Sequence, residues 1–253
     1  MDGPPPVFNP GKRALNRHPH GCEYRNSCSG CSILQAMPHS APPPSSAAEL
    51  IPSHASLAQL REAAKDCKAC DLWLRGTQTV FGEGARHAKV MFVGEQPGDK
   101  EDLEGRPFVG PAGALLDKAL VEAGIDRKLT YVTNAVKHFK WEPRGKRRIH
   151  KKPNSIEISA CRTWLDAEID VLKPQIIVCL GATAAQSLLG RTFRVTQQRG
   201  KLLPFRDGVT IAATVHPSSI LRAPDEESRH REMQLFIADL QVISKIIKAD
   251  DSA

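Results

Sequence analysis

Several side chains that can bind or react stand in a glycine-rich segment directly after a short apolar run. The segment GEQPG, residues 94–98, places Glu95 and Gln96 between glycines, which allow a ligand to approach the backbone closely. The following GRPFVGPAG, residues 105–113, holds Phe108 among prolines and glycines. An aromatic ring in a rigid loop can stack on a planar base, although it can equally anchor a buried loop. The pattern alone also allows GEQPG to be an ordinary strand-to-helix loop.

A second polar segment, HPSSILR at residues 216–222, follows a later apolar run. Ser218 and Ser219 can cap the next helical turn and leave amides or hydroxyls for phosphate. His216 would face whatever occupies the end of the preceding strand, and Arg222 adds a cation. The alternative is a capped loop in which the histidine is incidental.

Positive charge is concentrated in one stretch of the chain. The formal net charge is +7, and residues 137–152 alone contain eight Lys or Arg and one Glu. The rest of the chain is therefore near neutral, and the local excess favours a polyanionic partner. One histidine, His150, lies in this stretch, within RGKRRIHKKPN at residues 144–154. Taken alone, the stretch indicates a solvated phosphate-binding face with a stray imidazole.

The chain contains seven cysteines, an odd number. Cys67 and Cys70 form a CxxC pair, which by itself fits zinc, redox or cluster chemistry. Cys161 lies far away in sequence, and Cys179 stands inside an apolar strand, where a free cysteine acts as a small hydrophobe. Without a secretory signal, a metal or redox role is favoured over a disulfide framework. Cys67, Cys70 and Cys161 are thus three possible thiolate ligands of a metal site, and the sequence pattern alone does not identify a fourth.

The amino-terminal segment, residues 1–56, is rich in proline and poor in periodic hydrophobicity, so we expect it to be mostly disordered. A small zinc knuckle would be available from its cysteines and histidines, which are Cys22, Cys28, Cys31, His18, His20 and His39. No signal peptide or membrane-spanning run is evident. We therefore expect a soluble cytoplasmic protein, associated with the nucleoid if the organism is bacterial.

Strand and helix patterns alternate from Leu57 onward. We expect strands at 89–94, 129–136, 175–181 and 209–217, helices at 56–67, 112–124, 155–173, 182–190 and 227–248, and a hairpin-like stretch at 195–205. This alternation predicts a three-layer α/β/α domain, residues 57–249, around a mostly parallel four-stranded sheet, with a short tail at 250–253. Functional groups gather at the carboxyl ends of such strands, where GEQPG, TNAVKHFK, GATAA and HPSSILR lie.

Three motifs, taken in order, resemble the iron–sulfur uracil-DNA glycosylases, the family-four branch of that superfamily, over about residues 57–248. GEQPGDKEDLEGRPFVGPAG resembles the first active-site motif, TNAVKHFK the uracil-reading strand end, and HPSSILR the second active-site motif. Two departures are similar to the UdgX class, whose members bond covalently to uracil-containing DNA. These are Gln96, where family-four enzymes usually carry alanine, and the basic loop with KRRIH at 146–150.

The resemblance implies a [4Fe–4S] cluster held by Cys67, Cys70, His138 and Cys161. The UdgX class is similar in having histidine at the place of His138, although ligation by cysteine alone is the commoner rule. A rival set would use Cys179 instead. Such a cluster can pin the amino-terminal helix and the loop beside the DNA without transferring electrons.

The resemblance also implies how an extruded uracil would be held, because the glycosidic bond is inaccessible in a stacked duplex. Phe108 would stack on the base, and Asn134 would bond to its edge, since an amide offers both a donor and an acceptor. Gly94 and Gln96 would complete the pocket. His216 would stabilise the negative charge that develops on uracil O2. The DNA phosphates would be held by Lys146, Arg147, Arg148, Ser218, Ser219 and Arg222.

By the same resemblance, His150 would add to the sugar C1′ in place of water, through a neutral imidazole that the nearby cations favour. Glu95 would orient His150 or accept its proton, with Gln96 and Asp102 tuning the contact. The product would be a stable protein–DNA adduct formed in one turnover, and we expect a monomer that prefers single-stranded DNA. The alternatives are a conventional hydrolytic glycosylase and a non-catalytic iron–sulfur module that binds nucleic acid.

Overall fold

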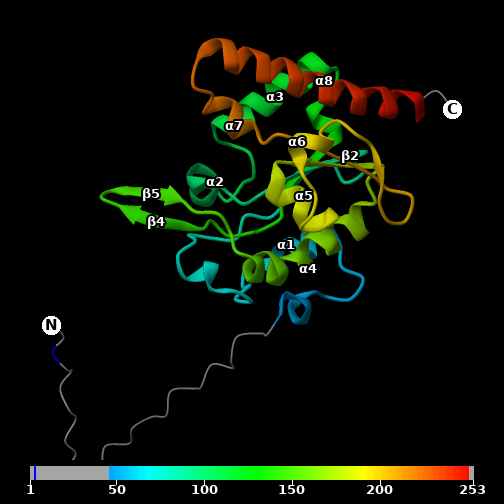
Figure 1. Ribbon diagram of the computed structural model, residues 1–253. Helices are drawn as coiled ribbons and strands as arrows, with labels where there is room; N and C mark the ends of the chain where they lie inside the picture. The colour runs from blue at the N-terminus through cyan, green and yellow to red at the C-terminus, as the bar shows by residue number, and fades with distance from the viewer. Residues whose placement is uncertain (1–2, 4–45, 251–253) are drawn as a thin grey trace, which may run out of the picture. The chain divides into compact units, whose positions relative to one another are not determined.

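The computed structural model describes Gly3 and residues 46–250. From Ser46 onward the chain forms a three-layer α/β/α domain with a mostly parallel central sheet (Figure 1). Four parallel strands match the predicted apolar runs: β2 Val90–Gly94, β3 Thr130–Asn134, β6 Ile176–Leu180 and β8 Thr210–Thr214. Two short antiparallel strands, β1 Glu83–Gly84 and β7 Leu203–Pro204, bring the order to β1-β3-β2-β6-β8-β7. The sheet is therefore wider than the four strands expected.

The register of the parallel strands brings their carboxyl ends to one edge of the sheet. Gly94 at the end of β2 pairs with Asn134 at the end of β3, and Leu180 at the end of β6 pairs with Thr214 at the end of β8. The polar segments that follow these strands therefore start next to one another, as expected for an open parallel sheet.

Helices cover both faces of the sheet. Their bounds are α1 Leu57–Ala64, α2 Asp99–Glu104, α3 Pro111–Ala123, α4 Ser155–Leu172, α5 Ala182–Leu189, α6 Val195–Gln198, α7 Pro217–Leu221 and α8 Glu226–Asp250, and three 3-10 turns are η1 Ala47–Leu50, η2 Asp71–Leu74 and η3 Arg127–Leu129. Local sequence sets their ends. Helix α4 starts with a capping box between Asn154 and Glu157, and α3 ends at Gly124, whose φ of 70° a glycine adopts readily.

The core forms one layer on each face of the sheet, because alternate strand residues point to opposite sides. Val90 and Phe92 pack with residues of α3 and α8, whereas Met91 and Val93 pack with residues of α4 and α5. Figure 1 shows α3, α7 and α8 above the sheet and α1 and α4 below it. In the described part of the chain, no helix is long and apolar enough to cross a membrane.

Two segments differ from the expected elements. Residues 47–50 form η1 and Ala47 is fully buried, so packing begins before Leu57, inside the segment expected to be disordered. The stretch at 195–205 begins with a helical turn, α6, and only its end, β7, forms a hairpin, by pairing antiparallel with the following strand β8. The cysteines and histidines of the possible zinc knuckle lie outside the described residues.

The basic stretch is an ordered β-hairpin rather than a loop. Strands β4, Trp141–Arg144, and β5, Arg147–His150, pair in a separate two-stranded sheet. Gly145 in the connecting turn has a φ of 59°, which glycine adopts at little cost. The hairpin projects from one side of the domain (Figure 1) and ends at His150, opposite Trp141.

Candidate functional site

A cavity of about 840 Å³ opens at the carboxyl ends of the central strands. Glu95 and Gln96, which follow β2, contribute to its wall together with Thr183 at the start of α5. His216, which precedes α7, and His150, at the end of β5, also line it. The fold thus brings segments that are far apart in sequence to a single cavity.

His150 and Glu95 are in direct contact at this cavity. Nε2 of His150 lies 3.3 Å from Oε1 of Glu95, and the hydroxyl of Thr183 donates to Oε2. Burial opposes ionisation of Glu95, but the hydrogen bonds from His150 and Thr183 outweigh it and hold the pKa of the carboxyl below its ordinary value. Thr183 was not predicted as a site residue, although its segment GATAA follows an apolar strand in the same way as the others.

His216 caps α7, which reverses the expected arrangement in which Ser218 and Ser219 were the caps. Its Nδ1 accepts a hydrogen bond from the Ser218 backbone N–H at 3.1 Å, and Ser219 Oγ donates to the His216 carbonyl at 2.7 Å. An acceptor at Nδ1 leaves the ring proton on Nε2. Burial lowers the pKa of His216 to about 4, so the ring is neutral at pH 7.

Phe108 and Asn134 converge on Gly94. A Cβ at position 94 would overlap the Asn134 side chain and would lie 2.8 Å from Cζ of Phe108. The Phe108 ring stacks near His216, with ring centroids 6.2 Å apart and an interplanar angle of 30°. Phe108 also has a φ of 59°, a strained conformation that is typical of functional loops. Only glycine at position 94 allows both side chains to come together here.

Gln96 lies at the base of the hairpin rather than between Phe108 and Asn134. Its Nε2 donates to the carbonyls of Lys140 and Lys151 at 3.2 and 3.0 Å, and its Oε1 accepts from the Lys140 N–H at 3.1 Å. The side chain therefore joins the strand that enters the hairpin to the strand that leaves it. Gln96 fixes the position of the hairpin relative to β2.

Asp102 is fully buried, and among the described residues its carboxylate contacts Thr77 and Arg148 rather than His150 or Glu95. Its carboxylate accepts from the backbone and hydroxyl of Thr77 and from Arg148 Nη1 at 2.5 Å. Arg148 also donates to Asp99 Oδ1 at 2.6 Å. Arg148, which was predicted to bind DNA, instead attaches β5 of the hairpin to α2, in addition to the attachment through Gln96.

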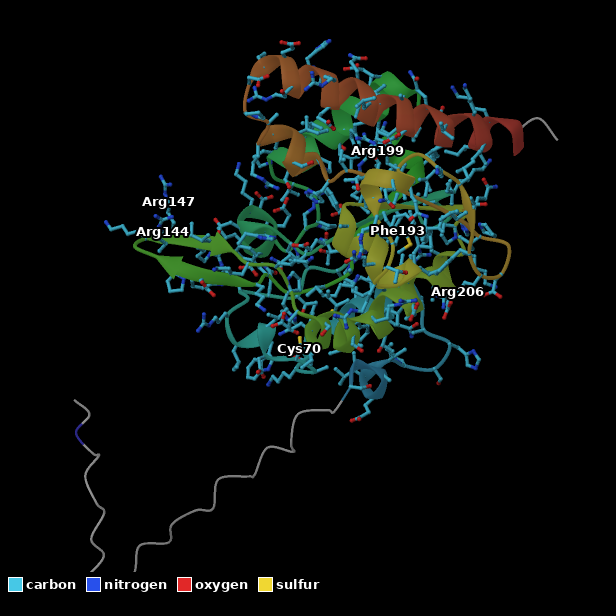
Figure 2. All side chains as sticks on the ribbon, in the orientation of Figure 1. Cys70, Arg144, Arg147, Phe193, Arg199 and Arg206 are labelled. Carbon is cyan, nitrogen blue, oxygen red and sulfur yellow. The ribbon has the colours of Figure 1, made fainter. Side chains whose placement is uncertain are left out.

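The basic stretch divides into paired and unpaired cations. Lys137 pairs with Glu168, Lys140 with Glu157 and Lys151 with Glu142. No ion pair is recorded among the described residues for Arg144, Lys146, Arg147 and Lys152, all of which are exposed. Figure 2 shows Arg144 and Arg147 at the tip of the hairpin, with their side chains directed away from the domain. Lys152 and Arg222 lie at the cavity itself.

Three cysteines share one small core cluster, and a fourth does not. Cys67, Cys70 and Cys161 pack around Trp164, whereas Cys179 belongs to the core beneath α4 and α5. The sulfurs accept N–H donors: Trp164 Nε1 lies 3.2 Å from Cys67 Sγ, and the Lys137 backbone N lies 3.1 Å from Cys161 Sγ. Such donors suit thiolates that bind a metal cluster. The packing separates Cys179 from the other three.

His138 has a ring state that suits a ligand. Thr79 Oγ1 donates its only proton to the Ala64 carbonyl at 2.8 Å, so its 3.0 Å contact with His138 Nε2 requires that Nε2 carry the proton. Nδ1 then keeps the lone pair that a metal needs. Within the described residues, no three His, Cys, Asp or Glu converge as they would around a single metal ion. A four-iron cluster takes one ligand on each iron, so its ligands surround it rather than meet at one point. The donor set therefore fits such a cluster.

The comparison with known families decides the relationship. The model of the Uracil DNA glycosylase superfamily matches residues 81–241, which include the cavity residues but not Cys67 and Cys70. The chain belongs to the uracil DNA glycosylase superfamily. It is 38% identical to a type-4 uracil-DNA glycosylase of Thermotoga maritima over 190 residues, 75% of this chain and 93% of that protein.

Two further members of the superfamily, one named type 4 and one named type 5, can be compared with this chain. A type-4 uracil-DNA glycosylase of Sulfurisphaera tokodaii is 39% identical over 67% of this chain and 78% of its own length. A type-5 uracil-DNA glycosylase of Pyrobaculum aerophilum is 28% identical over 65% of this chain and 76% of its own length. Within the superfamily, the chain is thus more similar to these type-4 proteins than to this type-5 protein.

Proposed function

We propose that this member of the uracil DNA glycosylase superfamily removes uracil from DNA and retains the sugar through a covalent bond to His150, as in the UdgX class. The observation that carries this proposal is the contact between His150 and Glu95 at the wall of the cavity that His216 also lines. A nucleophile, a carboxylate and a neutral hydrogen-bond donor are the three groups that such a reaction uses.

In the first step, the bond between C1′ and uracil N1 breaks, and its electron pair leaves with the base. Phe108 and Asn134, which meet at Gly94, would stack on the extruded uracil and bond to its edge. The Nε2–H of the neutral His216 ring would donate a hydrogen bond to uracil O2 as negative charge develops there. The ionised Glu95 would stabilise the positive charge on the sugar.

In the second step, a nitrogen of neutral His150 adds its lone pair to C1′. The resulting imidazolium releases the proton on its other nitrogen to water, and the uracil anion takes up a proton from water. Glu95 lies 3.3 Å from the ring and would orient it. Gln96 holds the base of the hairpin and Arg148 holds β5, so both would act by positioning His150 close to the sugar.

A [4Fe–4S] cluster would be held by Cys67, Cys70, Cys161 and His138. When bound, it supplies covalent cross-links between α1, the end of β3 and α4, and no electron transfer is assigned to it. The N–H donors to two of the sulfurs and the lone pair on His138 Nδ1 support this ligand set. Iron and sulfide analysis of anaerobically purified protein tests it. Cluster loss in a His138→Ala variant is expected, whereas Cys179→Ala should retain the cluster.

The exposed cations of the hairpin and of the cavity rim would bind the phosphates on either side of the uracil. Arg144, Lys146 and Arg147 lie at the tip, and Lys152 and Arg222 lie at the cavity. A single strand can bring its backbone to both places without unpairing, so we infer a preference for single-stranded DNA acted on by one protein molecule. This arrangement suits a role in DNA repair.

The test is incubation with a uracil-containing oligonucleotide, followed by denaturing gel electrophoresis, with a thymine oligonucleotide as the control. A heat-stable, shifted band that forms only with uracil is expected, and His150→Ser or His150→Gly should abolish it. An undiminished band in either variant would refute the role of His150.

A second candidate function is conventional hydrolysis, favoured by the similarity to proteins named type-4 uracil-DNA glycosylases. In that case uracil and abasic DNA would be released over many turnovers, and no band would shift. Release of more than one uracil per protein molecule would decide for this alternative.

A further inference from the structure

A buried ion pair lies next to the carboxyl end of β3, where Asn134 is located. Lys137 Nζ lies 2.5 Å from Glu168 Oε2, and the two side chains are 1% and 0% exposed. A buried pair of this kind adds little stability compared with apolar residues of the same size, because both charges lose their hydration. Its presence therefore calls for a role other than stability.

All donors of Lys137 are used within this network. Besides Glu168, Nζ donates to Thr133 Oγ1 at 2.6 Å and to the Asn134 carbonyl at 2.8 Å, which accounts for the three protons of an ammonium group. Glu168 in turn accepts from the Tyr131 hydroxyl at 2.9 Å and from the Gly82 N–H at 3.0 Å. Burial and the neighbouring Glu168 raise the pKa of Tyr131, so the phenol remains a donor. The network is fully satisfied and therefore rigid.

The turn that contains Lys137 also joins three parts of the site through its backbone. Ala135 N–H donates to the Gly94 carbonyl at 2.9 Å, and Val136 N–H donates to the Glu95 carbonyl at 3.0 Å. Lys137 N–H donates to Cys161 Sγ at 3.1 Å. Four successive residues thus connect the Asn134 backbone, the segment that carries Glu95, and the cysteine cluster.

We propose that Lys137, held by Glu168, is a positioning residue that fixes the Asn134 strand end against Glu95 and links it to Cys161. This inference rests on the proposed function, since it assigns the positioning of the uracil-reading side chain. Asn134 is the last residue of β3, and its carbonyl accepts a hydrogen bond from the Lys137 ammonium group. Loss of this partner would loosen Asn134 and reduce the rate of bond cleavage without weakening the contacts to the DNA backbone.

The test uses the double variant Lys137→Met, Glu168→Gln. Changing Lys137 alone would leave a buried, uncompensated carboxylate and destabilise the fold. In the double variant, the amide oxygen of the substituted side chain at position 168 can still accept from Tyr131 and Gly82. Leu240→Ala, which truncates a buried core residue of α8, serves as the control for general destabilisation.

Two measurements are made on the cluster-loaded protein. The first is hydrogen–deuterium exchange of the peptide that spans residues 133–138, which we expect to rise in the double variant and to stay low in Leu240→Ala. The second is single-turnover cleavage of uracil DNA, in which we expect the first-order rate constant to fall at least about tenfold while the half-saturating protein concentration and the amplitude stay unchanged. A merely structural role would lower the amplitude instead.

Unchanged exchange at residues 133–138, or a wild-type rate constant together with raised exchange, would overturn the positioning role. A wild-type protein that shows no uracil-dependent cleavage would instead overturn the proposed function. Raised exchange in the double variant would then still support the role of Lys137 in fixing the strand end.

Discussion

His150 and Glu95 meet at a distance of 3.3 Å, although one ends the projecting hairpin and the other follows a central strand of the sheet. The contact depends on two attachments of the hairpin, through Gln96 and through Arg148. The side chain of His150 on the projecting hairpin is thereby held close to the partly buried carboxylate of Glu95.

Replacing Glu95 by glutamine keeps the shape of the side chain and removes its charge. We expect the single-turnover rate of uracil release to fall about 100-fold, because the positive charge on the sugar loses its stabilising partner. Quench-flow or gel-based measurement of uracil release tests this. Thr183→Val, which removes only the hydroxyl donor to Glu95, should cost much less. A Glu95→Gln protein as fast as wild type would exclude the electrostatic role.

Removing the Gln96 side chain should change the fate of the sugar more than the rate of cleavage. Gln96→Ala loses three hydrogen bonds that hold the base of the hairpin, so water would compete better with His150 for C1′. We expect the ratio of adduct to released abasic DNA to fall about tenfold, which corresponds to about 1.4 kcal/mol. Gln186→Ala, which removes a glutamine that bonds to a backbone carbonyl from α5, is the matched control. An unchanged ratio in Gln96→Ala would argue against the positioning role.

The pKa of His216 predicts how stability depends on pH. Burial lowers this pKa from 6.5 to about 4, so between these values the unfolded chain binds a proton that the folded protein does not. As the pH falls from 6.5 toward 4, wild type should therefore lose up to about 3 kcal/mol of unfolding free energy relative to His216→Gln. Urea unfolding of both proteins at pH 7 and pH 4.5 measures the difference. A difference that stays constant with pH would contradict the buried neutral state.

The exposed cations at the hairpin tip should determine part of the salt dependence of DNA binding. Changing Arg144, Lys146 and Arg147 together to glutamine should reduce the slope of log affinity against log salt by about 2 on single-stranded DNA, at roughly 0.7 for each phosphate contact. Fluorescence anisotropy at several salt concentrations measures the slope. Lys118→Gln on α3 is the control, and an unchanged slope in the triple variant would show that the tip does not contact phosphates.

The sequence by itself determined the central architecture. The four parallel strands are buried on both faces and therefore appear as continuous apolar runs. Helices α3 and α5 end at a glycine, and α4 ends just before Pro174, so their ends could be predicted as well. Parallel strands place their carboxyl ends along one edge, so the polar segments after them could be expected to come together. The superfamily likewise followed from motifs in their order along the chain.

Only the tertiary structure decided which partner each polar side chain contacts at the carboxyl ends of the strands. Gln96 and Asp102 were expected to tune the contact of His150, yet they hold the hairpin and Arg148 instead. Lys137 was counted among the surface charges of the basic stretch, yet it is buried against Glu168. The sequence shows where charges lie and how apolar residues are spaced. The direction of a polar side chain in a loop, however, depends on partners that are distant in sequence. Those partners are fixed only when the strands and helices have packed.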